Sequence, residues 1–316
     1  NNGLSEELLN LWEKALRGFM PGIRLIIVDP LDYEIYIDHM VREIPDEPRR
    51  IVLDITHGLR HMPVIMAFSL MTLKHLKAIS DIVVYYGAYD LKKNRKDDSE
   101  PTPVLRMDFI NTLVSYAENL AIFNNSGYFP ALLDGLGIPG TDKTYFWLEM
   151  NRQPRSALEK ISGELTEKIT QDNHEAIIAQ YIKDDIDSLI GASLDRRMVE
   201  RAMFFFDKKQ YLKALVLLYE GLTVAIGRKY GFSDSLHYKT AENIGKYIDR
   251  NKHTVFQDDK QINTYYDLKH TRNVAVHGSR GKRKEVQRCV EHQEQFEILF
   301  KEGLGLYEYI VGDKLC

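Results

Sequence analysis

Residues Arg49–Gly58 read RRIVLDITHG, an apolar run that ends in a cluster of polar side chains and a glycine. Ile51, Val52 and Leu53 form an uninterrupted hydrophobic stretch, which is typical of a strand covered on both faces. A strongly apolar helix is predicted from Pro63 to Ile79, shortly after the polar cluster. This order of strand, turn and helix predicts an α/β fold for the first part of the chain.

Further elements of the same kind flank this stretch. We expect helices at 4–19 and 33–44, and strands at 21–30, 81–91 and 102–109. The resulting βαβαβ order favours a mostly parallel, Rossmann-like sheet, which binds ligands at the carboxyl ends of its strands. The segments 54–58 and 85–87 both fall at such ends. The sequence starts at Asn1 without a methionine, and we expect a first strand of the sheet to lie upstream of residue 1.

From about residue 152 the strand signals stop, and apolar residues recur at the helical spacing i, i+3, i+4. An all-α bundle is therefore predicted for the second part of the chain. We expect its helices at 156–169, 174–190, 196–231 with a break near 207–210, 241–249, 261–272 and 285–309. The sequence GLGIPG at 135–140 marks the boundary. It divides the chain into a domain at 1–137, a connecting helical segment at 138–195 and a domain at 196–316.

Composition limits the choice of function. The chain has 316 residues, is 44% hydrophobic and carries a formal net charge of −4, so any contact with nucleic acid has to come from a local basic patch. Its two cysteines, Cys289 and Cys316, lack metal-ligand spacing and fit a reducing cytoplasm. The longest apolar stretch, Met62–Leu73, is too short to span a bilayer. We therefore expect a cytoplasmic protein without a membrane partner.

The polar cluster after the first strand consists of Asp54, Thr56, His57, Gly58 and Arg60. The helix that follows would present free N–H groups and a partial positive charge, which suit a phosphate. Thr56 and His57 can hydrogen-bond a sugar or base, Arg60 can bind a phosphate, and Asp54 can orient the turn. In the alternative interpretation, Asp54 and Thr56 only cap a strand-to-helix turn. One histidine and one aspartate are too few ligands for a metal.

The segments VLDITHGLRHMP and VVYYGAYDL together resemble the DxTHG signature of CRISPR-associated proteins that carry a CARF domain. The resemblance covers roughly residues 20–130. It implies a Rossmann-like domain that dimerises and binds a cyclic oligoadenylate across the two-fold axis. The ligand-binding residues that it implies are Asp54, Thr56, His57, Gly58, Arg60, Tyr85, Tyr86 and Gly87.

A second polar cluster, RNVAVHG, runs from Arg272 to Gly278. Five helical steps place Arg272 and His277 about 140° apart, but we expect the turn at Gly278 to bring them together. An arginine can stabilise charge on a phosphorane, and a histidine can transfer protons near neutral pH, so the pair suits RNA cleavage by 2′-OH attack. A single histidine cannot easily be both base and acid, which predicts a site composed from two copies. The alternative is an exposed arginine and a C-capping histidine on an ordinary helix.

Residues 196–316 resemble the HEPN domain, whose R-x4–6-H motif carries ribonuclease activity. The resemblance implies that Arg272 and His277 are catalytic and that Asn273 supports them. A basic run follows the motif and is a candidate RNA-binding patch, although such runs are usually solvated surface. It consists of Arg280, Lys282, Arg283 and Lys284.

Joined, the two resemblances imply a cyclic oligoadenylate-activated endoribonuclease of type III CRISPR antiviral defence. The expected protein is an allosteric homodimer or higher oligomer that needs no cofactor. Cyclic tetra- or hexa-adenylate would activate it, and single-stranded RNA would be its substrate. Two alternatives stay open. In one, the HEPN-like bundle is an inactive RNA-binding or dimerisation module of a sensor. In the other, the CARF-like domain also degrades its own activator.

Overall fold

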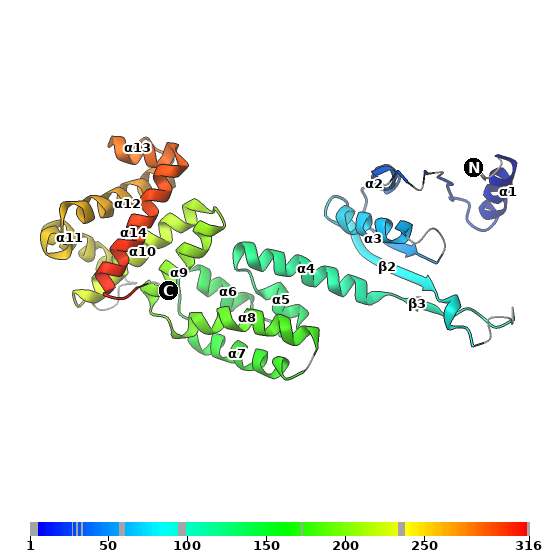
Figure 1. Ribbon diagram of the computed structural model, residues 1–316, viewed down its shortest axis with the longest axis horizontal. Coiled ribbons are helices and arrows are strands. Elements are labelled where there is room, and N and C mark those ends of the chain that lie inside the picture. Colours follow the sequence, from blue (N-terminus) through cyan, green and yellow to red (C-terminus); the bar gives the residue numbers. More distant parts are fainter. Residues whose placement is uncertain are drawn as a thin grey trace. The chain divides into compact units, whose positions relative to one another are not determined.

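The computed structural model describes residues 6–26, 28–29, 31–32, 34–56, 61–93, 99–171, 173–232 and 238–314. The chain divides into two compact units, Asn1–Ala117 and Glu118–Cys316. In the described residues the first unit combines a small mixed sheet with helices, and the second contains helices and no strand (Figure 1). The predicted order of an α/β part and a helical part is thereby confirmed. The units divide inside helix α4 (Asp108–Ser126), whereas the sequence placed the domain boundary after residue 137.

The sheet of the first unit has the strand order β1-β2-β3. Its strands are β1 (Arg49–Asp54), β2 (Ile79–Gly87) and β3 (Val104–Arg106). β1 and β2 are parallel and joined through helix α3 (His61–Lys74), as predicted, but β3 pairs antiparallel to β2. The described part of residues 88–103, which connect β2 to β3, contains only the short 3₁₀ helix η1 (Tyr89–Leu91). Two consecutive parallel strands are usually joined by a longer crossover helix, so this connection favours antiparallel pairing.

The core of the first unit lies where α3 packs on the sheet (Figure 1). Leu70 and Leu73 of α3 meet Leu53 and Val84 of the strands. Met40 of α2 (Glu34–Glu43) packs at the border of this cluster. The α3 prediction was right in type but too long, because the chain enters β2 at Ile79.

Two strand predictions fail in the first unit. Val52 is 61% exposed, so β1 is not covered on both faces, although its sequence is continuously apolar. The segment expected as a strand at 21–30 is not a strand in its described residues, which follow helix α1 (Glu6–Arg17) as turn and coil. A strand needs a hydrogen-bonding neighbour, and a short apolar run specifies none.

The second unit is built from a succession of helices, in agreement with the prediction. After α4 they are α5 (Pro130–Gly135), α6 (Asp142–Glu149), α7 (Arg155–Ile169), α8 (His174–Gly191), α9 (Leu194–Asp207), α10 (Tyr211–Lys229), α11 (Tyr238–Val255), α12 (Asp259–His277), α13 (Lys284–Glu291) and α14 (Gln293–Val311). The predicted break near 207–210 separates α9 from α10. The single helix expected at 285–309 is instead two helices, because the backbone of His292 is extended.

The core of this unit gathers side chains from α9, α10, α11, α12 and α14. Phe206 of α9 and Phe300 of α14 stack at 4.2 Å between ring centroids. Gly303 of α14 lets that helix approach α10 and α12 closely, since a Cβ there would lie 2.8 Å from Leu268 and 2.9 Å from Leu218. α12, which carries the second polar cluster, is thus fixed in the centre of the bundle. None of the helices in the described ranges combines the length and apolarity needed to cross a membrane.

Candidate functional site

The carboxyl ends of β1 and β2 are held together by backbone and side-chain hydrogen bonds. The N–H of Ile55 donates to the carbonyl of Tyr85 at 2.9 Å. One residue further along, the N–H of Gly87 donates to Oγ1 of Thr56 at 2.7 Å. The structure therefore brings the segments 54–56 and 85–87 to the same edge of the sheet, as the strand order predicted.

Asp54 and Thr56 form the turn that leaves β1. Oδ1 of Asp54 accepts the N–H of Thr56 at 2.8 Å and also its hydroxyl proton. Because a threonine hydroxyl has a single proton, Thr56 donates it to Asp54 and can offer a ligand only an acceptor lone pair. In this arrangement Asp54 orients the turn by holding Thr56, and the ligand-binding roles of both residues stay predictions.

Gly87 is required by the close approach of Thr56. A Cβ at residue 87 would lie 2.7 Å from Cγ2 and 3.0 Å from Oγ1 of Thr56, distances that real Cβ atoms rarely show. The glycine therefore allows the hydroxyl of Thr56 to reach the backbone of β2. This contact explains physically why the motif of the first strand is accompanied by a glycine at the end of the second.

The remaining predicted residues of this site are only partly described. Tyr85 and Tyr86 are half-buried at the end of β2, where they pair with Arg106 and Leu105 of β3. His57, Gly58 and Arg60, which carry the predicted phosphate contacts, lie outside the described residues. Their ligand-binding roles stay predictions.

Arg272, the first residue of the second cluster, is held by three neighbours. Its Nη2 donates to Oε1 of Glu220 at 2.6 Å, and its Nη1 donates to Oδ1 of Asn273 at 2.9 Å. Its guanidinium lies over the ring of Tyr219, 5.5 Å from the centroid. Nε is buried and has no hydrogen-bond partner in the described part of the chain. The guanidinium is thus fixed in one orientation, with one hydrogen of each terminal nitrogen left to bind an anion.

Glu220 and Tyr219 are neighbours of Arg272 that were not predicted from the sequence. Both lie on α10, some fifty residues before the motif, within the otherwise apolar segment LVLLYEGLTVAIG. A carboxylate on a buried helix face needs a hydrogen-bonding or ionic partner. A single glutamate in an otherwise apolar helical segment is therefore the sequence signal that could have identified Glu220. Its partner could not be read from the sequence, because the pairing depends on how α10 and α12 pack.

His277 does not converge with Arg272 inside one chain. α12 continues to His277, and Gly278 then takes the left-handed conformation that ends it, with φ of 60°. The turn therefore starts too late to move His277, and the two residues keep their separation of about 140° around the helix axis. The expectation that the turn brings them together is wrong for the single chain. His277 is exposed at the C-terminus of α12.

The basic run after the motif is mostly exposed. Arg280, Lys282 and Lys284 are open to solvent, whereas Arg283 pairs with Asp267 of α12 at 3.0 Å. Three cationic side chains of the run are therefore accessible beside the end of α12. A group of exposed cationic side chains can bind the phosphate backbone of a nucleic acid. Such groups are also common on ordinary solvated surfaces.

His270 and Asp267 of α12 both feel the charge of Arg283 in the basic run, and both have shifted pKa values. Burial lowers the pKa of His270, and the charges of Lys269 and Arg283 lower it further. Burial also raises the pKa of Asp267, against the opposing effect of Arg283. Burial and these two neighbouring positive charges thus favour the neutral form of His270. Within the described residues, no three His, Cys, Asp or Glu side chains are grouped so that they could hold a metal ion.

Comparison with known proteins adds no relative from which a role could be transferred. No family model matches the chain, and no curated protein matches its sequence. The function of the chain has to be inferred from the two polar clusters and from the residues around them.

Proposed function

We propose that this chain is a cyclic oligoadenylate-activated endoribonuclease of type III CRISPR defence, with a CARF-like sensing domain and a HEPN-like nuclease domain. The observation that carries the proposal is the R-N-x-x-x-H sequence at the end of α12, with its arginine oriented by Glu220 and Asn273. The DITHG sequence at the carboxyl edge of the sheet supports the sensing role.

In the proposed reaction the 2′-oxygen of a ribose attacks the adjacent phosphorus atom. A base takes the 2′-OH proton, the bond from phosphorus to the 5′-oxygen breaks, and an acid gives that oxygen a proton. The products are a 2′,3′-cyclic phosphate and a free 5′-hydroxyl. Arg272 stabilises the negative charge that builds on the phosphorane through its remaining N–H groups. This chemistry needs no metal cofactor.

The proton transfers require two groups, and His277 supplies one of them in each chain. Because Arg272 and His277 are far apart around α12, we propose that the site is composed from two copies, with one imidazole acting as base and the other as acid.

Activation would begin in the first unit. A cyclic oligoadenylate bound between two copies would favour one arrangement of the dimer, and segment 138–195 would transmit that preference to the nuclease pair. Val52 of β1, together with Val64 and Phe68 of α3, is more than half exposed. These apolar side chains support an interaction surface on the first unit.

The experiment that tests the proposal uses the full chain, labelled single-stranded RNA and EDTA, with cyclic tetra- or hexa-adenylate added or withheld. We expect one of the two rings to stimulate cleavage. His277→Ala and Arg272→Ala should abolish cleavage and leave oligoadenylate binding intact, and His253→Ala, which changes an exposed histidine outside the motif, should behave as wild type. Full cleavage by the His277→Ala dimer would falsify the catalytic role of this histidine.

A second function is favoured by one observation, the continuous helix that keeps His277 away from Arg272. In this alternative the bundle is a catalytically inactive RNA-binding or dimerisation module, and the protein is a regulator that senses oligoadenylate. Binding of both ligands without cleavage under any ring size would select this alternative.

A further inference from the structure

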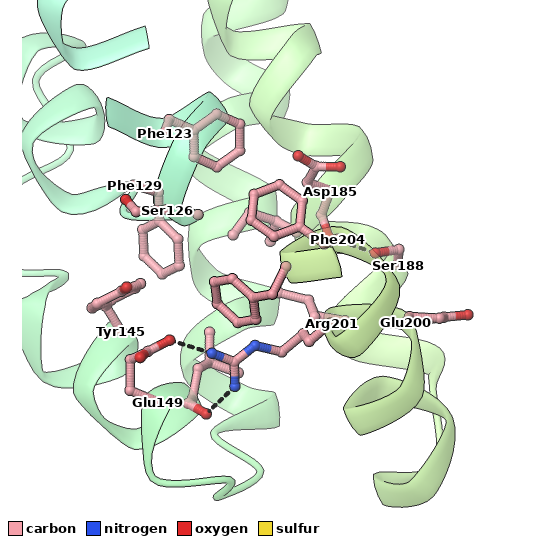
Figure 2. Close-up of a pocket in the computed structure, with 15 residues that line it drawn as sticks. Phe123, Ser126, Phe129, Tyr145, Glu149, Asp185, Ser188, Glu200, Arg201 and Phe204 are labelled. Carbon is pink, nitrogen blue, oxygen red and sulfur yellow. Dashed lines mark hydrogen bonds and ion pairs between the residues drawn. The ribbon is translucent and has the colours of Figure 1, made fainter. Parts of the chain in front are cut away.

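The second unit contains a pocket that neither polar cluster uses. It has a cavity volume of about 290 Å³ and is lined by side chains of α4, α6, α8 and α9 and of the turn after α4 (Figure 2). This volume is near the lower end of the range of small-molecule sites, which is about 300–1,000 Å³. The pocket therefore has room for a small organic molecule.

Five of the fifteen residues that line the pocket are aromatic. Phe129 and Tyr145 meet edge to face, with 5.4 Å between centroids and 90° between ring planes, and Phe204 and Phe205 meet at 5.3 Å and 75°. Figure 2 shows Phe123, Phe129 and Phe204 around the same space. Faces of aromatic rings attract cations, because the ring quadrupole is negative above the plane.

These rings already have cationic side chains as neighbours. The ammonium of Lys208 lies 5.7 Å from the centroid of Phe204, and that of Lys213 lies 4.7 Å from the centroid of Phe205. The guanidinium of Arg201 also lies over Phe205, at 5.6 Å. Three cationic side chains of the protein therefore already lie over two of the phenylalanine rings of this pocket.

Most of the charges in the wall neutralise one another. Arg201 pairs with the carboxylate of Glu149 and donates to the carbonyl of Leu148 at 2.7 Å. Glu200 pairs with Arg196 at 2.8 Å. These two carboxylates are therefore compensated and offer no net charge to a ligand.

Asp185 is different. It lines the pocket from α8, and no ion pair of its carboxylate is found among the described residues. Figure 2 shows it at the end of the pocket away from the pair of Arg201 and Glu149. Desolvation by the surrounding side chains and the charge of the neighbouring Asp184 raise the carboxyl pKa of Asp185, although the residue is exposed at the rim of the pocket. The pocket thus carries one uncompensated acid beside its aromatic wall.

We infer that this pocket binds a small organic cation, an amine whose apolar body lies among the phenylalanine rings and whose ammonium group meets the carboxylate of Asp185. The rings supply apolar contact and attraction for positive charge. The carboxylate supplies the counter-ion and a charge-assisted hydrogen bond. An anion of the same shape would meet Asp185 with like charge. This inference does not depend on the proposed nuclease function.

The test is calorimetric titration of the full chain with three molecules of similar shape and different charge: phenethylammonium, 2-phenylethanol and 3-phenylpropionate. We expect the cation to bind about tenfold more tightly than the alcohol, because only the ammonium group can form a charge-assisted hydrogen bond with Asp185, and the anion to bind most weakly.

Two substitutions locate the binding. Asp185→Asn should reduce the affinity for phenethylammonium to that for the alcohol. The matched control, Asp184→Asn, changes a neighbouring exposed carboxylate that does not line the pocket and should leave the affinity within about twofold. Phe204→Leu should weaken binding of the cation more than binding of the alcohol. Equal binding of the cation and the alcohol, equal effects of the two asparagine variants, or no binding of any of the three molecules would each overturn the inference.

Discussion

Nη2 of Arg272 on α12 lies 2.6 Å from Oε1 of Glu220 on α10, and this ion pair joins two helices that are distant in the sequence. Both side chains are about one-third exposed, with 30% of Arg272 and 33% of Glu220 open to solvent. Because solvent screens such a pair, its contribution to stability is small. Its more specific effect is to fix the plane of the guanidinium, which matters if Arg272 binds a phosphate.

Glu220→Gln should therefore impair the proposed cleavage more than it impairs folding. We expect kcat to fall about tenfold, because a mobile guanidinium has to be ordered during the reaction, and RNA affinity to change by less than about twofold. Glu302→Gln is the control, since Glu302 pairs with Lys260 at 3.1 Å outside the motif. Single-turnover cleavage and RNA titration measure the two quantities. An unchanged kcat in Glu220→Gln contradicts the positioning role.

The contact between Thr56 and Gly87 predicts a compensating pair of substitutions. Gly87→Ala should destabilise β2 by about 1–3 kcal/mol, because the new Cβ overlaps Cγ2 of Thr56. Thr56→Ser removes that methyl group and keeps the hydroxyl, so the double variant should regain about 1 kcal/mol. Native-state hydrogen exchange of the β2 amides measures the free energy of opening. Purely additive effects of the two substitutions would show that the contact with Thr56 does not determine the loss of stability in Gly87→Ala.

Two glycines of α14 should respond in opposite directions to alanine. Gly303→Ala should lower the free energy of unfolding by about 1–3 kcal/mol, since a Cβ there meets Leu268 and Leu218 below 3 Å. Gly305 has no atom within 4 Å of an added Cβ, so Gly305→Ala should raise that free energy by about 0.5–1 kcal/mol. Urea unfolding followed by helical circular dichroism compares the two. A change of the same sign in the free energy of unfolding of both variants would contradict the close packing of α14 at Gly303.

The thiol of Cys289 should react slowly in the native protein. Burial, and after it the negative charge of Asp267, raises the pKa of this thiol to about 11. A shift of that size from 9.0 makes the thiolate about 100-fold scarcer at pH 8 than for an unperturbed thiol. We expect a Cys316→Ser variant to react with a disulfide reagent correspondingly slowly and to speed up steadily as the pH rises towards 11. Rapid labelling of Cys289 at pH 8 in the folded protein would disprove the raised pKa of its thiol.

Local sequence was sufficient for most of the helices and for the parallel pair of strands. The spacing of apolar residues in 174–190 predicts α8, and the change of pattern near 207–210 predicts the break between α9 and α10. The expected strand at 21–30 and the single helix at 285–309 are two of the failures, and the long helix α4 was not predicted. Strand formation depends on a partner, and a helix break at one extended residue leaves the apolar periodicity almost unchanged.

The sequence by itself determined the two polar clusters, their placement on the end of a strand and on a helix, and the change from an α/β part to a helical part. Those properties follow from residue type and from spacing within a few positions. Tertiary structure alone decided that Thr56 reaches Gly87, that Glu220 holds Arg272 and that Asp185 lines an aromatic pocket. Each of these contacts joins elements that meet only through packing, so the distances between their side chains are set by the shape of the core.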